Sequence, residues 1–198
     1  MTPAAWWLVR HAAPQVAPGT CYGALDVPAN PQATQQTARR LAEALPTGTL
    51  ISHSPLQRCE QLARYLLALR PDLASNPGPR LREMDFGDLE GRPWADIARS
   101  EIDAWTQDFA HYRPGAGENL HSMLARVDTA RREALEALAQ GRPVAWITHA
   151  GVTRCVAWLS SHGGKLPLSH QWPLEAPGWG DWVMVRPGLT GEAPAQQT

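Results

Sequence analysis

The sequence lacks three features that would each assign it to a large class of proteins. Its 198 residues carry a formal net charge of −1, so there is no excess of basic residues for binding nucleic acid. No apolar run approaches the roughly 20 residues of a transmembrane helix. The chain also reaches a predicted strand within a few residues, which leaves no room for a signal peptide. We therefore expect a cytoplasmic protein that binds neither nucleic acid nor a membrane.

Cysteine is also scarce, because the chain has only Cys21, Cys59 and Cys155. An odd, scattered set fits a reducing compartment better than a disulfide framework, and its spacing is not that of a zinc site. No carboxylate cluster and no spacing of histidines and cysteines suits a catalytic ion. We expect no metal and no other cofactor.

The sequence does contain enough apolar residues, 43%, for a sizeable core. With no internal repeat and no long linker, we predict one domain over residues 1–188 and a disordered tail over residues 189–198. Strand-like and helix-like segments alternate, which predicts an α/β fold of three layers, with a mostly parallel central sheet and helices on both faces. Strands are expected at 6–10, 48–54, 143–149 and 181–185, and a short extended piece is expected at 80–86. Helices are expected at 31–45, from residue 54 onward, within 93–110, at 118–140 and at 151–161.

Basic residues stand where two of these strands pass into the following segment. Arg10 and His11 end the first strand, and His149 ends the strand before the helix that begins near Gly151. In a parallel α/β sheet, ligands bind at the carboxyl ends of the strands, so these side chains are expected at one rim. Free backbone N–H groups at the start of the helix would add a cradle for an anion.

The helix after the second strand contributes a further cation. Ser54 is predicted as its N-cap, with Pro55 at the first position and Gln57 completing a capping box. Arg58 then lies in the first turn, where a cation opposes the helix dipole at a cost of about 0.3–1 kcal/mol. An anion between Arg58 and the helix N-terminus would explain this. A single arginine there is usually solvated, and a single histidine at a strand end is usually structural, but three junctions together favour a phosphoryl site.

Four stretches of the chain resemble the signature blocks of the histidine phosphatase superfamily, which includes the cofactor-dependent phosphoglycerate mutases. They are LVRHA, SPLQRCEQLA, LREMDFGDLEG and WITHAGVTR, which follow the family's order between residues 8 and 154. The resemblance implies a phosphoglycerate mutase-like fold and a metal-independent phosphoric monoester hydrolase. Ala12 and Ala150 stand where the family often has glycine, but alanine is still small enough for close approach to phosphate. Leu89 replaces a common tryptophan, and we expect it to pack rather than to take part in the chemistry.

The resemblance also implies roles for individual residues. His11 would be the nucleophile and would form a phosphohistidine, with its second ring N–H held by a backbone carbonyl. The groups that would surround the phosphate are Arg10, Arg58, His149 and Ala150.

Glu83 is the general acid that the resemblance implies, and it would have to carry a proton when the substrate reacts. Asp85 is the rival carboxylate, because two residues on in an extended segment it would point to the same face. Glu118 either lies near the pocket mouth or is simply a favourable acid at a helix N-terminus. Three further residues stay open between lining the pocket and packing or solvation: Tyr22, His53 and Trp94.

The loop APGTCYGALDVP and the block LREMDFGDLEG resemble the alpha-ribazole phosphatase group, which acts late in cobalamin synthesis. The small-molecule substrate would then be alpha-ribazole 5′-phosphate, and a broad-specificity phosphatase for sugar or nucleotide monophosphates is the main alternative. A phosphoglycerate mutase is less favoured, because only 66 residues (149 − 83) separate Glu83 from His149 and mutases generally carry a longer segment there. A non-catalytic phosphate-binding protein would not need the acid. The leaving group and the oligomeric state stay open.

Overall fold

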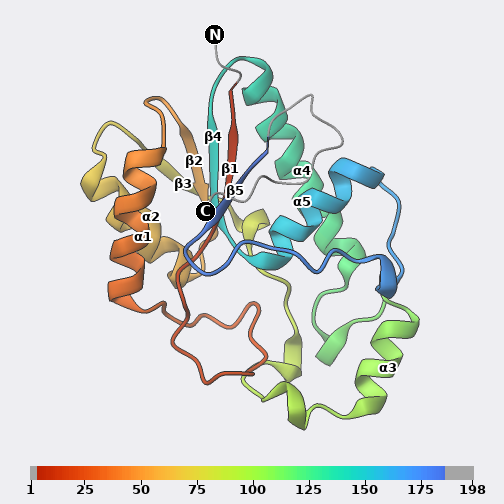
Figure 1. Cartoon of the computed structure of the whole chain (residues 1–198). Coiled ribbons are helices and arrows are strands. Elements are labelled where there is room, and N and C mark those ends of the chain that lie inside the picture. The colour runs from red at the N-terminus through yellow and green to blue at the C-terminus, as the bar shows by residue number, and fades with distance from the viewer. Residues whose placement is uncertain (1–3, 186–198) are drawn as a thin grey trace.

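Strands and helices alternate along the chain. The strands form one sheet, and helices cover both of its faces (Figure 1). The computed structural model describes residues 4–185, so the predicted domain end at residue 188 and the predicted tail at 189–198 lie outside the described residues. The strands are β1 (Trp6–Arg10), β2 (Leu50–His53), β3 (Ser75–Pro77), β4 (Val144–Thr148) and β5 (Trp182–Val185). The α-helices are α1 (Pro31–Ala44), α2 (Gln57–Leu69), α3 (Arg99–Gln107), α4 (Leu120–Ala139) and α5 (Ala150–His162), and short 3₁₀ turns are η1 (Pro79–Leu81), η2 (Gly87–Leu89), η3 (Trp94–Asp96), η4 (Pro114–Ala116) and η5 (Ser169–Gln171).

The sheet has the strand order β3-β2-β4-β1-β5, and all neighbouring strands are parallel except β5, which runs antiparallel to β1. The central strands β1 and β4 are almost entirely apolar and buried, as parallel strands covered on both faces must be. The predicted three-layer, mostly parallel sheet is confirmed. The edge strand β3 was not predicted, because its three residues carry no apolar pattern, and the predicted extended piece at 80–86 is an irregular segment outside the sheet.

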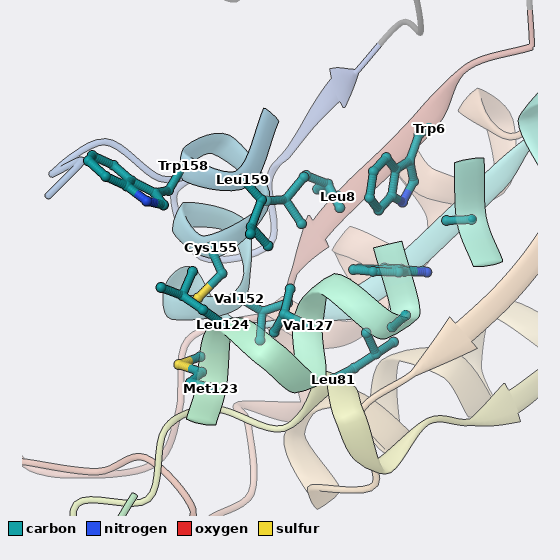
Figure 2. Packing of buried hydrophobic residues seen from close by; sticks show 14 of the residues in the cluster. Trp6, Leu8, Leu81, Met123, Leu124, Val127, Val152, Cys155, Trp158 and Leu159 are labelled. Carbon is teal, nitrogen blue, oxygen red and sulfur yellow. The ribbon is translucent and has the colours of Figure 1, made fainter. Parts of the chain in front are cut away.

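Two cores lie on the opposite faces of the sheet. Successive side chains of β1 alternate between them, since neighbouring residues of a strand point to opposite faces. Trp6 and Leu8 pack against α4 and α5 (Figure 2), whereas Trp7 and Val9 pack against α1 and α2. Trp6 also meets Trp146 of β4 edge to face, with ring centroids 4.6 Å apart. This packing fixes the ends of β1 and β4 relative to each other.

The helix after β2 begins differently from the prediction. It starts at Gln57, and Ser54 does not cap it, so the predicted capping box is wrong. Instead, the Asp26 carboxylate accepts a hydrogen bond from the Gln57 backbone N–H at 2.7 Å, and the Gln57 side chain donates to the Asp26 carbonyl. The cap comes from a loop 31 residues earlier, which a local pattern does not reveal.

The remaining predicted helices are confirmed with small shifts at their ends. Asn30 caps α1, and Asn119 caps α4 by accepting from the Ser122 N–H at 2.9 Å. The stretch 93–110 contains two short helices, η3 and α3. Figure 1 shows the long loop after β1 and helix α3 at the same end of the sheet. No helix within residues 4–185 is long and apolar enough to cross a membrane.

Candidate active site

One cavity, with a volume of about 360 Å³, opens at the carboxyl ends of the central strands. Its charged and small lining residues come from the end of β1, the segment after η1 and the start of α5, and they are Arg10, His11, Glu83, Ala150, Gly151 and Arg154. Its aromatic lining residues come mostly from the loops and from α3, and they are Tyr22, Phe86, Trp94, Trp105, Phe109 and Trp172. Thr20, Met84, Leu120 and Met123 complete the wall. The rim predicted from the strand ends is therefore a lined cavity.

His11 continues directly from β1 and is almost fully buried, with 2% of its surface exposed. Its backbone N–H donates to the Thr148 carbonyl of β4 at 3.1 Å, which locks the ends of the two strands together. Its ring Nδ1 lies 2.7 Å from the Ala12 carbonyl. A carbonyl can only accept, so we assign the proton to Nδ1, and in the neutral ring Nε2 then keeps its lone pair.

The surroundings of His11 keep this ring neutral. Burial, together with the positive charge of Arg58, lowers the pKa of His11 from 6.5 to about 3. The Ala12 carbonyl has the opposite effect but does not cancel it, and Arg10 lowers the pKa a little further. The imidazole therefore presents an unprotonated nitrogen throughout the physiological pH range.

His149 lies beside His11 at the N-terminus of α5, with the two ring centroids 5.2 Å apart. Burial, then the charge of Arg58 and the proximity of His11, lowers the pKa of His149 well below its ordinary value. Its Nε2 lies 2.8 Å from the Ser54 hydroxyl, which can donate to it. With Nε2 accepting, the proton of the neutral ring lies on Nδ1, which is buried and has no partner among the described residues. His149 itself is not among the residues that line the cavity, although its chain neighbours Ala150 and Gly151 are.

Arg58 is fully buried and does not line the cavity directly. Its guanidinium donates to the carbonyls of Gly23 at 2.6 Å and Leu25 at 2.8 Å, and it lies 5.3 Å from the centre of the Tyr22 ring. At the start of α2, where the sequence predicts an anion beside Arg58, the Asp26 carboxylate accepts from the Gln57 backbone N–H instead. Arg58 thus orders the loop after β1, and its charge also acts on both histidines.

The segment after α5 holds the two arginines that do line the cavity. Arg10 donates to the Pro177 carbonyl at 3.0 Å, and its guanidinium lies 5.3 Å from the centre of the Trp179 ring. Arg154 donates to the Leu174 carbonyl at 2.9 Å. Each of these arginines keeps a buried Nε–H without a partner among residues 4–185. The cavity therefore has positive charge and unused N–H donors at the end where His11 lies.

Glu83 reaches the same end of the cavity from the segment after η1. Its carboxylate accepts from the backbone N–H of Gly151 at 2.9 Å and from that of Met84 at 3.1 Å. A Cβ atom at Gly151 would overlap the Glu83 carboxylate, so only glycine leaves room for this contact at the start of α5. The glycine of the last signature block therefore positions Glu83.

The rival carboxylates have other contacts. Asp85 is exposed, caps the turn at Gly87 with a hydrogen bond of 2.8 Å and does not line the cavity, so the prediction that it faces the same way as Glu83 is wrong. The segment between η1 and η2 is not a regular strand, so its side chains do not alternate between two faces. Glu118 pairs with Arg126 through two hydrogen bonds of 2.7 and 2.8 Å rather than lining the cavity. Arg126 also donates to the Glu83 carbonyl at 3.2 Å, so this pair holds the backbone of the Glu83 segment.

The residues left open by the sequence divide into two groups. Tyr22 and Trp94 line the cavity. His53 does not, because it lies at the end of β2 with its Nδ1 2.7 Å from the Ser75 hydroxyl. Leu89 is buried and packs with Cys21, which confirms its packing role.

Sequence reasoning missed two residues that shape the loop after β1. Glu90 accepts hydrogen bonds from the backbone N–H groups of Ala24, Leu25 and Phe86, so it joins this loop to the segment that follows Glu83. A Cβ atom at Gly23 would overlap the Met84 carbonyl, which makes Gly23 necessary for the same close approach. In the sequence, Glu90 is visible only as part of the Glu-Gly pair that ends LREMDFGDLEG, and Gly23 only as part of the loop APGTCYGALDVP.

Comparison with known proteins identifies the family. The model of the histidine phosphatase superfamily (branch 1) matches residues 6–178. The chain belongs to this superfamily. It is 27% identical to the adenosylcobalamin/alpha-ribazole phosphatase of Salmonella typhimurium over 74% of each chain. It is 31% identical to the enzyme of the same name from Escherichia coli over 62% of each chain.

A solved structure extends the comparison to three dimensions. The alpha-ribazole phosphatase from Shigella flexneri superposes with a TM-score of 0.75 at 24% identity, covering 91% of this chain and 89% of the other. That likeness bears on the fold, which is phosphoglycerate mutase-like. Membership of the superfamily and the phosphatase relatives make this chain a phosphoric monoester hydrolase.

Proposed function

We propose that this hydrolase acts through a phosphohistidine on His11, with Arg10, Arg58, His149 and Ala150 stabilising the phosphoryl group and Glu83 as general acid. The observation that carries the proposal is the Nδ1 of His11, held 2.7 Å from the Ala12 carbonyl. This contact leaves the other ring nitrogen with a free lone pair, on a residue that lines the cavity together with Arg10 and Arg154. A neutral imidazole with one fixed N–H is the form that can attack phosphorus.

In the first step, Nε2 of His11 attacks the phosphorus atom. The new P–N bond forms while the bond from phosphorus to the ester oxygen breaks, and Glu83 gives its proton to the leaving alkoxide. The charge of Arg10 and Arg58, the free N–H of His149 and the backbone around Ala150 at the start of α5 stabilise the equatorial oxygens.

In the second step, water replaces the leaving group. The Glu83 carboxylate takes a proton from that water as its oxygen attacks phosphorus. The P–N bond breaks, its electron pair returns to Nε2, and inorganic phosphate leaves. The two steps together add one water to the ester and restore both His11 and Glu83.

Alpha-ribazole 5′-phosphate is the substrate we favour, within cobalamin synthesis. Support comes from the two relatives, which are adenosylcobalamin/alpha-ribazole phosphatases, and from a cavity with room for more than a phosphate. A broad-specificity sugar or nucleotide phosphatase is the alternative. A mutase fits less well, because the aromatic part of the cavity offers no cation for a substrate carboxylate, and a pure phosphate binder leaves Glu83 unexplained.

The proposal extends to the compartment, the domain organisation and the cofactors of the enzyme. We place the enzyme in the cytoplasm, which is supported by three buried cysteines that form no disulfide. We treat residues 1–188 as one histidine phosphatase domain that acts on a small molecule and uses neither a metal nor nucleic acid.

The test is release of phosphate from a panel of substrates in excess chelator. Alpha-ribazole 5′-phosphate should give the highest kcat/KM, above ribose 5-phosphate and 3-phosphoglycerate, and chelator should not reduce it. Loss of activity in chelator that a divalent metal restores would contradict the metal-independent mechanism. Equal kcat/KM across the panel would favour the broad-specificity alternative.

A further inference from the structure

The cavity wall that α3 and the loops contribute consists of aromatic rings. Trp94, Trp105 and Phe109 follow one another with ring centroids 6.4 and 6.0 Å apart, and each successive pair lies within 19° of parallel. Phe86 meets Trp94 and Trp105 edge to face, at 5.6 and 5.8 Å. Trp172 meets Phe109 at 6.0 Å in the same manner. We call these five residues the aromatic wall.

The aromatic wall is not simply a part of the core. Helix α3 has no buried residue, and Trp94, which precedes it, is 38% exposed. Trp105, Phe109 and Trp172 are only partly buried, and all of them line the cavity. Apolar surface left facing a cavity is unfavourable until something apolar covers it. The wall therefore points to a ligand.

Charge is distributed unevenly over the cavity. Among the described residues that line it, the cations are Arg10, beside His11, and Arg154, one turn beyond Gly151 on α5. Glu83 is the one acid of this lining. The phosphate of a substrate is thus drawn to the His11 end, and the rest of the molecule reaches a surface without charge. A planar ring fits that surface, whereas a second anionic group would find no cation there.

We propose that the aromatic wall is a binding subsite for a planar aromatic ring on the leaving group. The substrates would then be nucleoside 5′-monophosphates in the broad sense, with ribose spanning the distance between the phosphate and the ring. This inference rests on the proposed reaction at His11, and it adds the residues that select the leaving group. Trp94 is the residue to change, because it is the most exposed ring of the aromatic wall.

The first experiment compares substrates with the same leaving oxygen. Ribose 5-phosphate, adenosine 5′-monophosphate and alpha-ribazole 5′-phosphate all release a primary ribose hydroxyl, and the last two carry a planar base. Stacking on aromatic side chains contributes enough to favour the better ring-bearing substrate by roughly 10- to 100-fold in kcat/KM over ribose 5-phosphate.

The second experiment measures the same ratio in variants of Trp94. Trp94→Ala and Trp94→Leu, which retains apolar volume without a ring, should lower the ratio about fivefold or more, while Trp94→Phe should keep most of it. Because both substrates are measured on one preparation, partial loss of folding cancels from the ratio. A wild-type ratio near one, or a ratio unchanged in Trp94→Ala and Trp94→Leu, would overturn the subsite while leaving the reaction at His11 intact.

A third measurement separates the two proposals. Isothermal titration of His11→Ala with the same three compounds reports binding without turnover. If no substrate is hydrolysed by the wild type, the proposed function fails, and the subsite is then judged by whether the ring-bearing compounds bind at least about tenfold more tightly than ribose 5-phosphate. Equal dissociation constants would overturn the subsite.

Discussion

The two ends of the cavity are built from different kinds of structure. The phosphate end comes from β1, β4 and the start of α5, and its histidines are fully buried and tied to backbone groups or to the Ser54 hydroxyl. The aromatic end comes from a 3₁₀ turn, the short helix α3 and loops, and its rings are only partly buried. A rigid scaffold thus carries the chemistry, and the more exposed connections carry the selection of the leaving group.

The two ends also differ in the contacts that hold their functional groups in place. At the phosphate end, two backbone N–H groups donate hydrogen bonds to the Glu83 carboxylate. Arg126 also donates to the backbone carbonyl of Glu83. Backbone donors move little, so the carboxylate is positioned before any substrate arrives. The aromatic wall offers mainly packing contacts, and these tolerate variation in the ring that binds. Changes at the phosphate end should therefore affect every substrate, and changes at the wall should affect some more than others.

The largest expected effect comes from removing the nucleophile. His11→Ala should lower phosphatase turnover roughly 10³- to 10⁶-fold on every substrate, because the variant lacks the nitrogen that we propose as the nucleophile. Steady-state phosphate release measures it. His53→Ala is the matched control, since His53 also ends a strand but does not line the cavity, and it should keep activity within about threefold. A tenth of wild-type activity in His11→Ala would be incompatible with covalent catalysis.

Replacing the acid should have the next largest effect, and one that depends on the leaving group. Glu83→Gln should slow an alkyl phosphate roughly 10²- to 10⁴-fold, the usual range for general acid catalysis. With nitrophenyl phosphate, whose leaving group needs no proton, a burst of about one nitrophenol per site should persist before slow turnover. Rapid-mixing absorbance measures the burst. Asp85→Asn should behave as the wild type, and the reverse pattern in the two variants would make Asp85 the acid.

Displacing the Glu83 carboxylate without removing it should lower the rate less than replacing it. Gly151→Ala places a methyl group where the Glu83 carboxylate lies, so kcat for alkyl phosphates should fall about 10²-fold. Gly164→Ala is the matched control, because a Cβ atom there meets nothing within 4 Å. Comparison of kcat in the two variants checks the prediction. Equal activity in both would mean that the contact between Glu83 and the start of α5 has no role in positioning.

The smallest effect concerns stability rather than rate. The pKa of His11 is about 3 in the folded protein and about 6.5 unfolded, so the unfolded chain binds more protons between these values. This contribution to stability is present above pH 6.5 and is lost as the pH falls toward 3. Between pH 7 and pH 5 the loss amounts to about 2 kcal/mol.

Urea denaturation of the wild type and of His11→Gln at both pH values isolates this contribution. The loss of unfolding free energy on acidification should be smaller in His11→Gln by about 2 kcal/mol. Groups distant from His11 titrate equally in the two proteins and cancel, and the pKa of His149 stays lowered in both because burial and the charge of Arg58 are its larger causes. An equal loss in both would show that the His11 ring is not held neutral by its surroundings.

Much of the fold and of the phosphate end was predictable, because both depend on patterns that are local in the sequence. The apolar runs at 6–9 and 144–147 indicate central strands, and the residues that follow each run lie at the rim by the rule for parallel sheets. Placing Arg10, His11 and His149 together required no knowledge of side-chain contacts. Assigning Glu83 over Asp85 rested on the family resemblance.

What could not be predicted depends on contacts between distant segments. The cap on α2 comes from Asp26, the partner of Glu118 is Arg126, and Glu90 orders a loop about 65 residues earlier. The aromatic wall is of the same kind, since its residues come from separate segments and Trp105 and Phe109 have no distinguishing pattern in the sequence. From the sequence alone, aromatic residues on a short helix are equally consistent with packing in the hydrophobic core.

The phosphohistidine on His11 is the intermediate on which the proposed reaction depends, and it can be trapped. Glu83→Gln is mixed with nitrophenyl phosphate, quenched in alkali, in which phosphohistidine is stable, and digested for mass spectrometry. We expect one added phosphoryl group on the peptide that contains His11, at a stoichiometry that matches the burst, and none in the double variant with His11→Ala. A burst without a phosphorylated His11 peptide, or a phosphoryl group on another residue, would contradict it.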